Sequence, residues 1–180
     1  MDLVTDGSAS KSVLNWTQAD VNDQFKAGNA AMMINGPWQF PVLNEDTSLN
    51  YDVVPIPAPR AGATVIVPLG GETWTVPRSG DTARQQKAAM IVQCLNSDET
   101  QLKLATERQT VPTKTALQGR FVADQPSMKT FSELVANARA RTGQLGPEWP
   151  KAATKIYTAE QAALSGQATP AAALEQAQNG

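Results

Sequence analysis

Histidine is absent from this sequence, and cysteine occurs only once, at Cys94. Without histidine the chain can form no Ser-His-Asp triad, no imidazole metal site and no histidine general base. A single cysteine excludes an intrachain disulfide, and its position beside Ile91, Val92 and Leu95 predicts a buried thiol. We therefore expect neither a metal ion nor another cofactor.

Charge of one sign and long apolar runs are also scarce. The 15 basic and 17 acidic residues give a net charge of −2 without a basic cluster, so we expect no nucleic-acid partner. No apolar run is long enough to cross a bilayer, and the polar opening at Met1 and Asp2 predicts that this chain carries no signal peptide. The 41% of hydrophobic residues suffices for a packed core.

Capping residues and apolar periodicity predict helices, most of them in the second half of the chain. Strand patterns cluster in the first half, whereas a complete doubly wound domain alternates strands and helices. The sequence therefore indicates pieces of an α/β fold whose other strands lie elsewhere. The expected helices span residues 18–28, 81–96, 97–107, 126–140 and 151–164 and continue from Pro170, and the expected strands span residues 30–34, 51–56, 64–67 and 73–76.

Three of the four tryptophans follow glycine or proline breaks, namely Trp38, Trp74 and Trp149. An indole on a loop can pack against the C–H face of a pyranose while nearby amides and carboxylates bind the hydroxyl groups. Tryptophan taken singly is more often a packing residue, and Trp16, which has no such break beside it, is expected to be one.

Two other functions remain open from the residues alone. One is a glycosidase, in which Glu72 and Glu148 could form the paired carboxylates, or a carbohydrate-binding accessory module. A helical interaction domain without a small ligand is the other alternative, with the tryptophans in its core. Gly70 and Gly71 are not followed by the Lys-Ser/Thr pair of a phosphate-binding loop.

Residues 25–38, with the sequence FKAGNAAMMINGPW, resemble the F-x-x-G-x-A-A-M-x-x-x-G-x-W signature of family 1 extracellular solute-binding proteins. These are sugar-binding components of ABC transporters of the maltose-binding-protein type. Residues 51–57, 68–76 and 109–113 are similar, in order, to later segments of that family. The resemblance implies an α/β fold, namely part of a two-lobe periplasmic-binding-protein type II fold that is helix-rich and has an incomplete sheet.

The same resemblance implies a domain organisation and partners. Residues 1–65 would form part of the C-terminal lobe, residues 66–118 would cross the hinge into the N-terminal lobe, and residues 119–180 would return to the C-terminal lobe. The chain would be the C-terminal portion of an extracytoplasmic, non-enzymatic protein that delivers a sugar or oligosaccharide to an ABC permease. Either the missing N-terminal portion or a second copy of the chain would complete it.

The ligand-binding residues are also inferred from the resemblance. Trp38 matches the aromatic residue of the C-terminal lobe that stacks on sugar, and Trp149 lies near the other aromatic region of the cleft. Gly70, Gly71 and Glu72 match loop residues at the hinge that face the ligand. Trp74, close to them in sequence, completes the predicted set.

Overall fold

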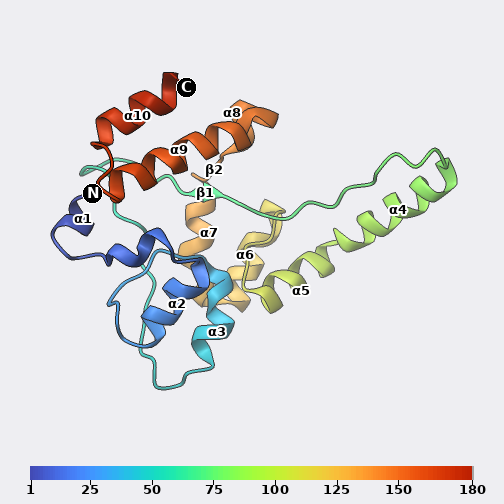
Figure 1. The fold of residues 1–180 in the computed structure, drawn as a ribbon. Helices are drawn as coiled ribbons and strands as arrows, with labels where there is room; N and C mark the ends of the chain where they lie inside the picture. Colours follow the sequence, from blue (N-terminus) through green and yellow to red (C-terminus); the bar gives the residue numbers. More distant parts are fainter. Residues whose placement is uncertain (180) are drawn as a thin grey trace. The chain divides into compact units, whose positions relative to one another are not determined.

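The computed structural model describes residues 1–179, which fall into two compact units. Unit 1 consists of Met1–Met33 and of residues 141 onward, and unit 2 consists of Ile34–Ala140. Figure 1 shows the helix-rich fold that the sequence predicts, in which the described residues form a single two-stranded sheet. The incomplete sheet is thereby confirmed.

All the regular secondary structure in the described part of unit 1 is helical. It contains α1 (Asp2–Thr5), η1 (Lys11–Leu14), α2 (Gln18–Lys26), α8 (Thr142–Leu145), η4 (Gly146–Glu148), α9 (Trp149–Leu164) and α10 (Pro170–Asn179). Helices α9 and α10 pack through the buried alanines Ala159, Ala163 and Ala173. Small side chains at this contact let the two helix backbones approach closely.

Helix α2 begins where its sequence predicts. The Thr17 hydroxyl accepts a hydrogen bond from the Asp20 amide at 3.3 Å, and the Asp20 carboxylate accepts one from the Thr17 amide at 2.7 Å. This reciprocal capping box satisfies two amides that the first helical turn leaves unpaired. The Thr17 amide, and the Thr17 hydroxyl at 2.7 Å, both donate to the Asp20 carboxylate and hold the pKa of Asp20 below its ordinary value.

Unit 2 contains the sheet and the larger apolar core. Its elements are η2 (Pro37–Gln39), α3 (Phe40–Asn44), β1 (Pro68–Leu69), α4 (Thr82–Leu95), α5 (Asp98–Arg108), α6 (Thr115–Asp124), η3 (Pro126–Met128), α7 (Lys129–Val135) and β2 (Arg139–Ala140). The buried side chains of the core are Phe40, Ala105, Phe121 and Met128. Strands β1 and β2 are parallel, with Pro68 opposite Arg139.

The prediction of four strands is wrong. Residues 30–34, 51–56, 64–67 and 73–76 form no strand, and Met32 and Ile34, expected in a buried strand, are 86% and 82% exposed. Period-two apolar patterns predict a strand only where a neighbouring strand can satisfy the backbone amides and carbonyls. Among the described residues, β1 and β2 alone supply such neighbours.

The predicted burial of Cys94 is also wrong. Its thiol is exposed, and helix α4, which carries it, has no buried residue. The apolar pattern of Ile91, Val92 and Leu95 was correct as a helix pattern. It predicted a packing face, which the described residues cover only in part: Val92 and Leu95 are half-buried, whereas Ile91 is 60% exposed.

Candidate ligand-binding site

The Trp38 side chain rests against the backbone of Gly36. A β-carbon at Gly36 would lie 2.1 Å from the indole Cη2 and Cζ3 atoms and 2.5 Å from Cε3, so the six-membered ring occupies the space of a missing side chain. The turn that allows this contact arises from Pro37, which starts η2 at its first position. Trp38 remains 49% exposed, so the indole is supported by the backbone and still accessible.

The chain immediately after Trp38 is anchored in the core of unit 2. Phe40 is 6% exposed, and its ring meets that of Phe131 edge to face at a centroid distance of 5.7 Å. The Phe40 ring also lies 6.1 Å from that of Tyr51, whose hydroxyl donates to the Asn44 side chain at 2.7 Å. Partial burial raises the pKa of Tyr51 above its ordinary value. These contacts hold the Trp38 loop on a packed helix.

The predicted ligand-binding residues Gly70, Gly71, Glu72 and Trp74 follow β1 in an exposed segment. Glu72 makes an ion pair with Arg108 at 3.6 Å, although both side chains are largely exposed and such a pair contributes little stability. Trp74 is 57% exposed, so it is accessible to a ligand. Among the described residues, no hydrogen bond, ion pair or ring contact joins this segment to Trp38, and their common site stays a prediction.

Trp149 lies at the start of α9, directly after the turn η4. Its side chain is half-buried, as is that of Trp16, the tryptophan expected to pack. Trp149 belongs to unit 1 and Trp38 to unit 2. Their participation in one cleft therefore stays a prediction from the family resemblance.

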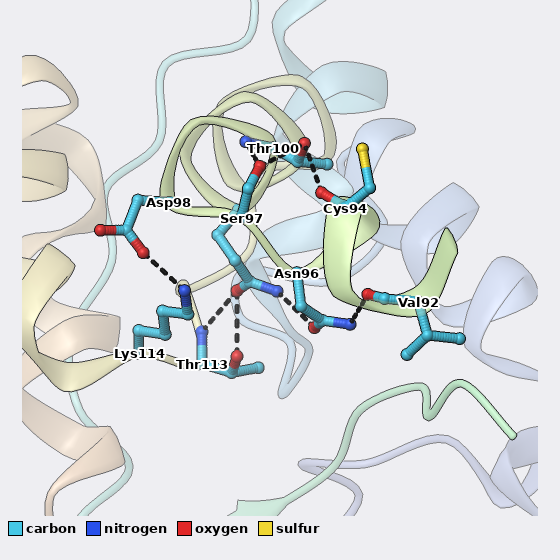
Figure 2. A network of polar contacts seen from close by, with 9 residues as sticks. Val92, Cys94, Asn96, Ser97, Asp98, Thr100, Thr113 and Lys114 are labelled. Carbon is cyan, nitrogen blue, oxygen red and sulfur yellow. Dashed lines mark hydrogen bonds and ion pairs between the residues drawn. The ribbon is translucent and has the colours of Figure 1, made fainter. Parts of the chain in front are cut away.

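A polar network that the sequence analysis did not identify fixes the loop before α6 (Figure 2). The Gln101 side-chain oxygen accepts from the Thr113 amide at 3.1 Å and from the Thr113 hydroxyl at 2.9 Å. The Gln101 amide group donates to Asn96 at 3.1 Å, and Asn96 in turn donates to the Val92 carbonyl at 2.8 Å. Gln101 thus connects the end of α4 with the loop at Thr113, twelve residues after Gln101 itself.

The N-terminal cap of α5 stabilises the same region, where α4 ends and α5 begins. The Ser97 hydroxyl accepts from the Thr100 amide at 3.3 Å, and the Thr100 hydroxyl donates to the Cys94 carbonyl at 3.2 Å. Lys114 forms an ion pair with Asp98 at 2.5 Å, which adds a second link between the loop and α5. The network therefore orients α4, α5 and α6 within unit 2.

Among residues 1–179, no three acidic or thiol side chains gather closely enough to hold a metal ion. Within the same residues, no helix has the length and apolarity required to span a bilayer.

Comparison with known proteins identifies the class of the chain. Residues 2–130 match the family described as bacterial extracellular solute-binding proteins. This chain is 24% identical to a protein of Brucella abortus strain 2308 that is provisionally named a binding protein. The match extends over 177 residues, which are 97% of this chain. Similarly named proteins of Brucella abortus biovar 1 and Brucella suis biovar 1 match equally well.

The family match covers most of the chain, and the chain therefore belongs to the bacterial extracellular solute-binding proteins. The family description indicates an extracytoplasmic location. The chain spans 42% of the length of the Brucella relatives.

Proposed function

We propose that this chain is part of the substrate-binding component of an ABC transporter, and that it contributes one wall of a carbohydrate-binding cleft. The observation that carries the proposal is the accessible Trp38 indole fixed against Gly36. A flat apolar ring that is already positioned binds a sugar face without losing side-chain freedom on binding. Ligand clefts are lined predominantly by apolar and aromatic side chains, with a few polar groups that orient the ligand.

The remaining parts of the proposal follow the family resemblance. Residues 1–65 and 119–180 would belong to the C-terminal lobe, and residues 66–118 to the N-terminal lobe. Gly70, Gly71, Glu72, Trp74 and Trp149 would complete the cleft. The captured sugar would then be delivered to a membrane permease, and no covalent step is needed for this role.

Calorimetric titration of the intact gene product with neutral saccharides tests the proposal. We expect Trp38→Ala to weaken binding by roughly 5–30-fold, since an aromatic contact contributes roughly 1–2 kcal/mol when its buried area is included. Trp38→Phe, which retains a flat ring, should lose less. Trp16→Ala is the matched control, because it removes an indole outside the predicted site.

Circular dichroism and affinity together distinguish a loss of binding from a loss of folding. Circular dichroism should show that the Trp38 variants keep the helical fold, because the side chain is half exposed. Equal affinity of the parent protein and Trp38→Ala for every saccharide bound would refute the role of this residue. Turnover of an aryl glycoside that is abolished by Glu72→Gln or Glu148→Gln would favour the glycosidase alternative.

A further inference from the structure

The loop that carries Trp38 contains a reactive pair of residues, Asn35 and Gly36. Asparagine is one of the chemically labile residues of proteins. In this sequence glycine directly follows Asn35 and Asn179, and a larger residue follows every other asparagine. Because glycine has no β-carbon, its backbone nitrogen can approach the preceding side chain closely. Asn179 is the last residue of helix α10, whereas Asn35 lies in a segment without regular secondary structure.

The structure brings the two reacting groups of this pair together. The Gly36 amide donates a hydrogen bond to the Asn35 Oδ1 atom at 2.9 Å. The side-chain carbon Cγ is bonded directly to Oδ1, so the Gly36 nitrogen lies beside the carbon that it would attack. Reacting atoms held about 3–3.5 Å apart in a suitable orientation react without the cost of bringing them together. Both residues are half-buried, so water can also reach the pair.

Deamidation is the reaction that this arrangement favours. The Gly36 nitrogen loses its proton to a base in the solvent and forms a bond to the Asn35 Cγ atom. The bond from Cγ to Nδ2 breaks, and Nδ2 leaves as ammonia after taking a proton from water. Water then opens the resulting succinimide ring at one of its two carbonyl carbons. Opening at Cγ gives aspartate at position 35, and opening at the main-chain carbonyl carbon gives isoaspartate.

The two products differ in their effect on Trp38. Aspartate leaves the main chain unchanged, and its carboxylate can accept the same bond from the Gly36 amide. Isoaspartate leads the main chain through Cβ and Cγ, which inserts a methylene group before Gly36. The indole of Trp38 is in close contact with this backbone, since a β-carbon at Gly36 would lie 2.1 Å from Cη2. Phe40 is fixed in the core, so the insertion must be absorbed in the short segment that contains Trp38.

We propose that Asn35 is a site of spontaneous deamidation in the folded protein, and that its isoaspartate product displaces the Trp38 indole from Gly36. The reaction requires only this loop and water, and it is therefore independent of the proposed function. One consequence does rest on the proposed function. Saccharide affinity should fall, by up to the roughly 5–30-fold expected for Trp38→Ala, as isoaspartate accumulates.

Peptide mapping by mass spectrometry, after incubation of the intact gene product in oxygen-labelled water, tests the chemical step. The Asn35 peptide should take up labelled oxygen, and part of it should become a substrate for an isoaspartyl methyltransferase. The reaction should be faster at mildly alkaline than at mildly acidic pH, because the Gly36 nitrogen must lose its proton. Asn35 should react at least about 10-fold faster than Asn29, which precedes an alanine earlier in the same loop.

Two glutamine variants provide a matched pair for the structural step. Asn35→Gln should stop the reaction, because the longer side chain cannot form a succinimide, whereas Asn29→Gln should react as the parent does. In proteins with Trp38 as the sole tryptophan, acrylamide quenching of its emission should rise during incubation of Asn29→Gln and stay constant in Asn35→Gln. Asn35→Asp reproduces the product with an unchanged main chain, so its quenching should match that of fresh parent protein.

The proposal is overturned if Asn35 stays intact in the folded product over a time in which the urea-unfolded protein deamidates. It is also overturned if the isoaspartate form, separated by chromatography, shows the same quenching as fresh protein. Both results come from the parent protein and are obtained even if Asn35→Gln fails to fold. Failure of fresh protein to bind any saccharide would refute the proposed function and would leave both measurements unchanged.

Discussion

Replacing Gly36 by alanine should displace the Trp38 indole while leaving the backbone in place. Non-bonded carbon atoms lie about 3.5–4.0 Å apart, and the new β-carbon would start 2.1 Å from Cη2 and Cζ3. The ring must therefore move by roughly 1.4 Å or more. Gly36 has φ −112° and ψ 168°, an extended conformation that alanine adopts without strain.

The expected effects on stability and on binding are different. Loss of the ring contact is offset by the smaller conformational freedom of alanine in the unfolded chain, which contributes about 0.4–1 kcal/mol. The free energy of unfolding should therefore change by no more than about 1 kcal/mol. Affinity for the saccharide should fall nearly as far as in Trp38→Ala, by roughly 5–30-fold.

The assay uses a protein in which Trp38 is the sole tryptophan, with phenylalanine at positions 16, 74 and 149. Acrylamide quenching of Trp38 emission should increase in Gly36→Ala, because the ring leaves the backbone surface. Gly119→Ala is the control, since a β-carbon there meets no atom within 4 Å and should leave emission and affinity unchanged. Unchanged quenching in Gly36→Ala would refute the inferred contact.

Three further predictions concern unit 2 and helix α2. Phe121→Ala should lower the free energy of unfolding by about 3–5 kcal/mol in urea denaturation, because Phe121 is 1% exposed in the core; a loss below about 1 kcal/mol would contradict that packing. Asp20 has a lowered pKa, so the stability that its carboxylate provides should be present above its ordinary pKa of 3.8 and disappear as pH falls through the folded-state pKa. Thermal unfolding of Asp20→Asn should therefore differ from the parent near neutral pH and converge with it in acid, and a constant difference would argue against this linkage. Gln101→Ala should speed exchange of the Thr113 amide, whose acceptor is lost, and continued protection would show that the network does not fix the loop.

Local capping signals predicted the helices because they involve residues close in sequence. The Thr17 box starts α2, Ser97 caps α5, and Thr169 accepts from the Ala172 amide at 3.2 Å before α10. Helix α6 was missed because it has no side-chain cap at Lys114 and contains Gly119, a weak helix former. The helix expected over 126–140 ends earlier, at Val135.

Features that depend on distant partners could not be predicted in the same way. A period-two pattern describes which face of a strand is apolar but does not identify the neighbouring strand. The contact of Trp38 with Gly36 depends on the side-chain conformation, and the Gln101 bonds depend on how the chain returns at Thr113. The sequence indicated an accessible aromatic residue at position 38, whereas its support by Gly36 required the structure.

Binding of a carbohydrate on the Trp38 indole is tested most directly by calorimetric titration of the intact gene product, with all its tryptophans present, against mono-, di- and oligosaccharides. We expect saturable binding of one class of saccharide and weaker binding of that class, by roughly 5–30-fold, in Trp38→Ala. Equal affinity of the two proteins for every saccharide bound, or no binding of any saccharide by the unsubstituted protein, would contradict the proposal.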